Sequence, residues 1–415
     1  MTEERLKVEL HLEKAKLAAG TSQTVDVLVR LAPPNVDVSE AKRPKLNIGI
    51  ALDRSGSMDG AKMREAREAA KYCVDQMLPS DVFSAVIFDD EVDVLFTSQP
   101  VGDRAMLKRG IDRIEARNST ALHQGWVEAG LQVSERLDPN AINRVLLITD
   151  GQANVGETNP TRIIEHARSL GSRGVSTSTI GIGTDFNEDL LMPMAEAGQG
   201  NAWHVQEPDD MKRIFETELN GLLMQFGHTA ALAISPAAGV TVEDVLNDFE
   251  KDGQGRYILP NLMHGSPLNI IVRLKVPARD IGDTLDLADF SVSYVSQTLN
   301  APKTETVRMV ADLDSREAVD ALTANPEVLE SLTLLNNARA RREMMDHIDR
   351  GDYEIAKCVR ASMEQETSVL FSRVASPRLA EELEDLRDLD PLLSRQDHSS
   401  RKRMAYRRES TRKSK

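Results

Sequence analysis

The chain carries two kinds of hydrophobic pattern. Between residues 45 and 226, near-continuous apolar runs at 46–52 and 144–149 alternate with segments such as 61–78, in which apolar residues recur at helical spacing. Near-continuous runs are typical of parallel strands buried on both faces, and helical spacing is typical of helices that cover such a sheet. The alternation predicts a doubly wound, mostly parallel α/β sheet. Apolar segments on either side of Asp89 predict a hairpin, which makes one edge of this sheet antiparallel.

Strict alternation of apolar and polar residues flanks this region on both sides. Alternation is typical of half-buried strands, and two strands alone do not form a stable sheet. The 415 residues also exceed what one hydrophobic core usually serves. We therefore expect segments 1–44 and 227–312 to form one β-sandwich, into which an α/β domain at 45–226 is inserted. The half-buried strands are predicted at 6–12, 24–31, 228–234, 256–259, 268–276 and 287–295.

Helical periodicity replaces the strand pattern in the segment 313–395. Residues 326–350 and 352–366, separated by Gly351, predict an αα-hairpin, and a third helix is predicted at 377–389. The fold class expected from the whole chain is thus an α/β domain of the doubly wound type, inserted into a β-sandwich and followed by a helical region.

The end of the chain is basic, although the whole chain carries a net charge of −15. Residues 401–415 hold eight Lys or Arg and one Glu, a net charge of +7. Charge runs are typical of solvated segments, so we predict a basic disordered tail at 396–415; docking on an acidic surface, including the protein's own, is the alternative. We expect no nucleic-acid partner, because the acidic remainder repels phosphate and Tyr406 is the tail's only aromatic residue.

Oxygen-bearing side chains are concentrated in three predicted loops. The first loop follows the strand 46–52, the second precedes the helix predicted at 121–137, and the third begins where a second buried strand ends at Asp150. Because the carboxyl ends of parallel strands meet at one edge of a sheet, these side chains are expected to lie together. Carboxylate and hydroxyl oxygens are the hard ligands that Mg²⁺ or Mn²⁺ selects. The sequence therefore predicts a shallow Mg²⁺ or Mn²⁺ site formed by Asp53, Ser55, Ser57, Thr120 and Asp150.

The pattern Asp53-x-Ser55-x-Ser57, followed by Thr120 and Asp150, resembles the metal-ion-dependent adhesion site of the von Willebrand factor A-domain family. The resemblance covers roughly residues 45–226, and the whole chain resembles intracellular bacterial members of the family that have a β-sandwich and a helical C-terminal region. It implies that the two serines contact the metal directly, that both aspartates act mainly through bound waters, and that the threonine joins according to the ligand state. An Asp or Glu of a protein partner would complete the coordination.

Two classes of function are compatible with these residues. The first is a binding module, not an enzyme, in which the metal captures an acidic side chain of a partner during complex assembly or regulation. The second is a metal-dependent phosphoester hydrolase that uses the same crevice. Ser55 stands where a haloacid-dehalogenase-like phosphatase has its second acid, and no general base is evident, so binding is favoured. A metal that only stiffens the loops is a third interpretation.

Several features indicate the compartment. The first twelve residues have no apolar core of signal-peptide length, and no later apolar run is long enough to cross a bilayer. Cys73 and Cys358 are the only cysteines, and neither belongs to a CxxC pair. We therefore expect a cytoplasmic protein with no membrane partner.

Overall fold

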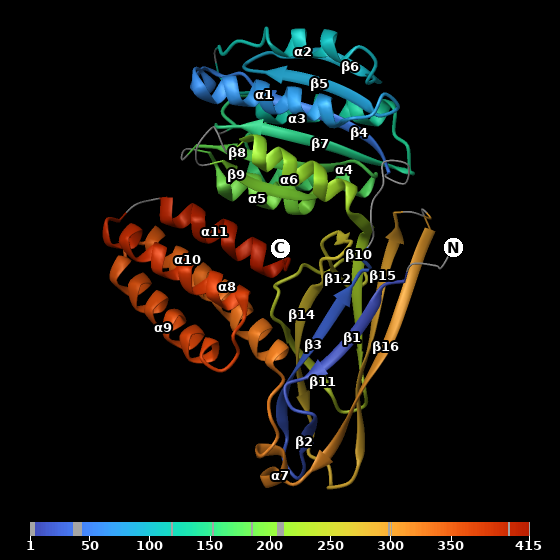
Figure 1. Cartoon of the computed structure of the whole chain (residues 1–415), viewed down its shortest axis with the longest axis vertical. Coiled ribbons are helices and arrows are strands. Elements are labelled where there is room, and N and C mark those ends of the chain that lie inside the picture. The colour runs from blue at the N-terminus through green and yellow to red at the C-terminus, as the bar shows by residue number, and fades with distance from the viewer. Residues whose placement is uncertain are drawn as a thin grey trace. The chain divides into compact units, whose positions relative to one another are not determined.

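The computed structural model divides into two compact units that are interleaved along the chain. One unit comprises residues 37–225 with 297–300, and the other comprises residues 1–36, 226–296 and 301–415. The first unit therefore interrupts the second, which confirms the prediction of an inserted α/β domain (Figure 1). The structure describes residues 5–35, 44–117, 119–151, 153–183, 186–205, 211–297, 299, 301–396 and 399–414.

The inserted unit is built on a six-stranded sheet with the order β6-β5-β4-β7-β8-β9. All neighbouring strands are parallel except β5 and β6, which form the predicted antiparallel edge. The strands are β4 (Lys45–Asp53), β5 (Val82–Phe88), β6 (Val92–Pro100), β7 (Ala141–Thr149), β8 (Ser176–Ile182) and β9 (Gln199–Val205). The helices are α1 (Ala61–Gln76), α2 (Arg104–Ile111), α3 (Leu122–Glu135), α4 (Pro160–Ser172), α5 (Glu188–Ala197) and α6 (Met211–Leu223).

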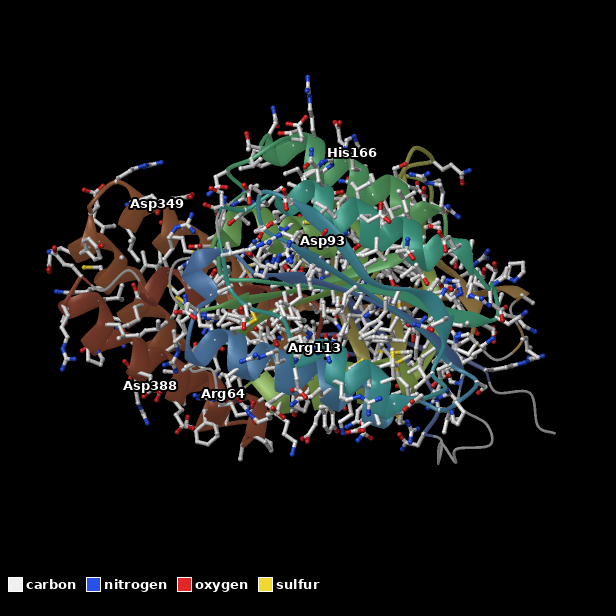
Figure 2. All side chains as sticks on the ribbon, turned by 90° about the horizontal axis from the view of Figure 1, so that it is seen from above. Arg64, Asp93, Arg113, His166, Asp349 and Asp388 are labelled. Atoms are coloured by element: carbon white, nitrogen blue, oxygen red, sulfur yellow. The ribbon has the colours of Figure 1, made fainter. Side chains whose placement is uncertain are left out.

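Helices cover both faces of this sheet, as the near-continuous apolar strands require. Ile50 of β4 packs in a core with α1, α2 and α6, whereas its neighbour Ala51 packs in a second core with α3, α4 and α5. Figure 2 shows the two layers, with Arg64 of α1 on one side of the sheet and His166 of α4 on the other. Gly49 lets α3 approach β4, because a Cβ there would lie 2.6 Å from Cγ2 of Val133.

The second unit contains a β-sandwich whose two sheets share one hydrophobic core. One sheet has the order β1-β3-β14-β11, so strands from the two ends of the interrupted segment pair directly, with Leu31 of β3 opposite Leu268 of β14. The other sheet has the order β12-β10-β15-β16-β2, with β13 paired to β10. The strands are β1 (Lys7–Leu12), β2 (Lys16–Ala18), β3 (Gln23–Ala32), β10 (Gln225–Pro236), β11 (Thr241–Val245), β12 (Tyr257–Ile258), β13 (Leu262–Met263), β14 (Leu268–Val276), β15 (Thr284–Ser296) and β16 (Ala301–Asp314).

Helices complete this unit. Gly351, with a φ of +84°, turns the chain between the two helices of the predicted hairpin. Inside the helical region, Arg341 and Glu382 are both fully buried and form an ion pair of 2.7 Å. The helices are α7 (Arg316–Asp320), α8 (Pro326–Asp349), α9 (Tyr353–Phe371), α10 (Pro377–Ser394) and α11 (Ser399–Arg412). Within the described ranges, none of the helices has the length and apolarity needed to cross a membrane.

The prediction of a disordered basic tail at 396–415 is wrong where the structure describes the tail, because residues 399–412 form α11. Its basic side chains find partners in the same unit: Arg401 pairs with Asp349 at 2.7 Å and Arg403 with Asp388 at 3.0 Å (Figure 2). Met404 is fully buried. The docking that was the alternative expectation is therefore what the structure has. Residues 397, 398 and 415 lie outside the described residues.

Candidate metal site

The five residues predicted as metal ligands lie on three loops at the carboxyl edge of the α/β sheet. Asp53 is the last residue of β4, and Asp150 follows the last residue of β7, its parallel neighbour. Ser55 caps a short 3₁₀ helix, η2 (Gly56–Met58), which contains Ser57. Thr120 lies two residues before α3. The edge rule for parallel strands thus brings distant parts of the sequence together.

Hydrogen bonds connect four of these residues in a string. The backbone N–H of Ser55 donates to Oδ1 of Asp53 at 2.8 Å. The hydroxyl oxygens of Ser55 and Ser57 are 3.2 Å apart, and the Ser57 hydroxyl donates to Oδ1 of Asp150 at 2.8 Å. Each hydroxyl oxygen has a further lone pair, so this string still has acceptor capacity for a cation.

Thr120 faces the same gap as Asp53. A Cβ built on Gly151 would lie 3.5 Å from Oγ1 of Thr120 and 3.6 Å from Oδ2 of Asp53, so glycine leaves the space between the loops open. The Thr120 loop is held from the other side, because its backbone N–H donates to Oδ1 of Asn154 at 2.9 Å. The structure therefore brings together all five residues singled out in the sequence.

The electrostatics of the site are those of buried negative charge. Asp53 and Asp150 are 0% and 2% exposed, whereas Ser57 is exposed and marks the side open to solvent. Burial raises the pKa of Asp53 to about 6, and the nearby carboxylate of Asp150 adds to the shift. Hydrogen bonds from Thr149, at 2.5 Å, and from Ser55 act in the opposite direction. A cation in this gap would remove the cost of charging Asp53.

An ion cluster around the buried Asp89 lies next to the site, and the sequence patterns did not predict it. Arg54, the variable position of the motif, is 7% exposed and pairs with the fully buried Asp89 at 3.1 Å. Arg117 also contacts Asp89, at 2.5 Å. Burial would raise the pKa of Asp89, but the backbone N–H of Glu91 and the two guanidinium groups outweigh it and hold the pKa below its ordinary value.

This cluster ties the loops of the site to one another. The backbone N–H of Ala121 donates to the carbonyl of Asp89 at 2.5 Å, and the backbone N–H of Arg117 donates to the carbonyl of Arg54 at 2.7 Å. The loop that carries Thr120 is thereby fixed against the loop that carries Ser55 and Ser57. A signal was present in the sequence, since Asp89 directly follows the last residue of β5 at the same edge as Asp53.

All of the candidate ligands at this site are oxygen donors. Among the described residues, no group of three or more His, Cys, Asp or Glu is placed to hold a metal ion. A metal in this gap would therefore use hydroxyl oxygens in addition to the two carboxylates. Such an all-oxygen set fits Mg²⁺ or Mn²⁺ better than a metal that prefers thiolate or imidazole.

Comparison with known families identifies the inserted unit. Residues 47–217 match the family model of the von Willebrand factor type A domain. This segment is a von Willebrand factor type A domain. Domains of this family commonly mediate protein interactions, and those with a metal-ion-dependent adhesion site bind divalent metal ions.

Relatives of known sequence match between about two fifths and three fifths of this chain. An uncharacterized protein of Synechocystis sp. is 26% identical over 262 residues, which cover 60% of this chain and 61% of that protein. Inter-alpha-trypsin inhibitor heavy chain H2 of Homo sapiens is 28% identical over 190 residues, which cover 43% of this chain and 19% of that protein. The chain thus spans less than two thirds of the length of these curated relatives.

Solved structures extend the likeness of fold to nearly the whole chain. A von Willebrand factor type A protein from Catenulispora acidiphila has a TM-score of 0.70 at 17% identity and covers 94% of this chain and 91% of its own. The ArnB paralog VWA2 from Sulfolobus acidocaldarius has a TM-score of 0.61 at 18% identity and covers 98% of both chains. The combination of a von Willebrand factor type A domain with the second unit therefore recurs in other proteins.

Proposed function

We propose that this protein is a metal-dependent binding module. Its von Willebrand factor type A domain would hold Mg²⁺ or Mn²⁺ at the carboxyl edge of the sheet, and the bound metal would capture an Asp or Glu side chain of a protein partner. Ser55 and Ser57 would contact the metal directly, whereas the aspartates would act mainly through water. The proposed ligand set is Asp53, Ser55, Ser57, Thr120 and Asp150.

The observation that carries this proposal is the hydroxyl string between two buried carboxylates. The side chains of Asp53 and Asp150 are buried. The hydroxyls of Ser55 and Ser57 lie between them, and Ser57 is the residue exposed to solvent. A divalent cation would balance the buried negative charge and keep coordination positions for an incoming carboxylate. Protein ligands to Mg²⁺ are commonly few, which leaves room for such a partner.

An intracellular setting is part of the proposal. Cys73 and Cys358 are free thiols, and Cys358 is exposed, as is ordinary in a reducing compartment. Burial raises the pKa of Cys73 to about 12, so this thiol packs in the core and does not act as a nucleophile. We propose a role in complex assembly or regulation, with the β-sandwich and the helices as scaffold.

A metal-controlled pull-down tests the proposal. Wild type and Ser57→Ala, each immobilised with Mg²⁺ or with EDTA, would be exposed to a lysate of the source cells. We expect proteins that wild type retains only with Mg²⁺ and that Ser57→Ala does not retain. Equal retention in EDTA would contradict the proposal. Hydrolysis of a phosphate ester by wild type, lost in Ser57→Ala, would favour the hydrolase instead.

A further inference from the structure

A lysine from α1 reaches into the candidate metal site. Lys62 is the second residue of α1, and its ammonium donates to Oδ2 of Asp150, the oxygen that Ser57 does not use. The Lys62 side chain is 27% exposed, whereas the Asp150 side chain is fully buried. A Cβ on Gly183 would lie 3.6 Å from Nζ of Lys62, so the ammonium is held between Gly183 and Asp150 at the rim of the site.

This contact changes the charge that an incoming metal meets. Asp53 and Asp150 together carry two negative charges when ionised, and Lys62 returns one positive charge to the same small volume. A lysine ammonium is a compact point charge. At short range in a partly buried site, its repulsion of a divalent cation is not fully screened by water. It also occupies one lone pair of Asp150 that water bound to a metal would otherwise use.

We propose that Lys62 is a built-in competing cation that sets the metal affinity of the site. This inference rests on the proposed function and deepens it. The ammonium stabilises Asp150 without metal and opposes a divalent ion that enters beside Ser57. The site therefore binds metal more weakly than its two carboxylates alone would, and Lys62 makes its occupancy sensitive to the concentration of the ion.

Titration with Mn²⁺ alone tests this role in the full-length protein. Lys62→Met keeps the apolar stem and removes the charge, so its Mn²⁺ affinity should rise by about tenfold. Lys62→Arg keeps the charge and should stay within about threefold of wild type. The matched control is Lys108→Met, which removes a lysine paired at 2.8 Å with Asp75 on the same domain, and it should leave the affinity unchanged.

Thermal melting in EDTA supplies a second readout. Lys62→Met should melt below wild type in EDTA, because Asp150 loses its cation, and should reach or pass wild type once Mn²⁺ is added. If Ser57→Ala abolishes Mn²⁺ binding while Lys62→Met binds as wild type or more weakly, the role of Lys62 is overturned and the metal site stands. If neither wild type nor Lys62→Met binds Mn²⁺, the proposed metal site itself is overturned.

Discussion

Two buried carboxylates in the α/β unit differ in how the fold balances their negative charge. Glu218 of α6 is fully buried, and each of its oxygens is satisfied: Arg144 and Ser178 donate to Oε1 at 2.8 and 2.6 Å, and Asn201 and Trp203 donate to Oε2 at 2.6 and 2.8 Å. Asp53 is equally buried, but its hydrogen bonds come from a hydroxyl and a backbone N–H.

The pKa values of the two groups show the difference. Burial alone would raise the pKa of Glu218, but Arg144 and the hydrogen bonds from Asn201 and Ser178 outweigh it and lower the pKa. Burial prevails at Asp53, whose pKa rises to about 6. Glu218 therefore pairs with a cation of the fold, Arg144, whereas the lysine at the metal site pairs with Asp150 and ionising Asp53 stays costly. The first arrangement is structural, and the second is the one we expect of a binding site.

The strongest test of this contrast is Glu218→Gln. Removing one partner of a buried ion pair leaves Arg144 uncompensated, so the free energy of unfolding should fall by about 3 kcal/mol in urea at neutral pH, with metal affinity unchanged. Because the pKa of Glu218 is lowered, its stabilisation is present above the ordinary glutamate pKa of 4.5 and is lost as the pH falls through the lower folded pKa. Glu216→Gln, at a partly exposed position of α6, is the control and should change little. Equal stability of the two variants would contradict a structural role for Glu218.

The pH dependence of metal binding gives the next largest effect. With a pKa of about 6, Asp53 is ionised at pH 7.5 and mostly protonated at pH 5, and a protonated carboxyl does not hold a cation. Mn²⁺ affinity should therefore fall by about tenfold between pH 7.5 and pH 5, as calorimetry would measure. Affinity should not change between pH 7.5 and pH 8.5. The same affinity at pH 5 and pH 7.5 would remove Asp53 from the ligand set.

Asp53→Asn should have the smallest effect, and its sign is opposite to that of Glu218→Gln. The pKa of Asp53 is higher in the folded state than the ordinary aspartate pKa of 3.8, so ionising Asp53 costs stability as the pH rises through about 6. In EDTA at pH 7.5 the amide should therefore raise the free energy of unfolding by about 1 kcal/mol, which is less than the pKa shift alone would give, because both Asp53 oxygens accept hydrogen bonds and an amide keeps only one acceptor oxygen. Mn²⁺ should stabilise wild type but not the variant. A destabilised Asp53→Asn in EDTA would mean that Asp53, like Glu218, is a structural charge.

Much of the site follows from the sequence because its causes are local. The apolar runs of β4 and β7 predict buried parallel strands, and Asp53 and Asp150 then lie at one edge by the geometry of such sheets. The inserted domain follows in the same way from two strand patterns of different period. These signals need no knowledge of contacts between distant residues.

The missed features depend on contacts that no local pattern encodes. Arg54 is buried because the carboxylates of Asp89 and Asp93, on other parts of the chain, pair with its guanidinium at 3.1 and 2.6 Å. The basic end of the chain folds as α11 because Asp349 and the carbonyl of Asn247 accept from its arginines. Composition gives the charge of a segment, but it does not show whether the fold brings groups of the opposite charge next to that segment.

Metal titration of Ser57→Ala is the sharpest test of the proposed metal site. The Ser57 side chain is exposed, and its hydroxyl lies within hydrogen-bond distance of the Ser55 hydroxyl and of Asp150. Alanine therefore removes a proposed direct ligand of the metal without creating a cavity in the core. The control is Ser172→Ala, another exposed serine, at the end of α4. We expect Mn²⁺ affinity to fall roughly 100-fold, about 2.7 kcal/mol, in Ser57→Ala alone, with circular dichroism unchanged. Wild-type affinity in a folded Ser57→Ala would contradict the account.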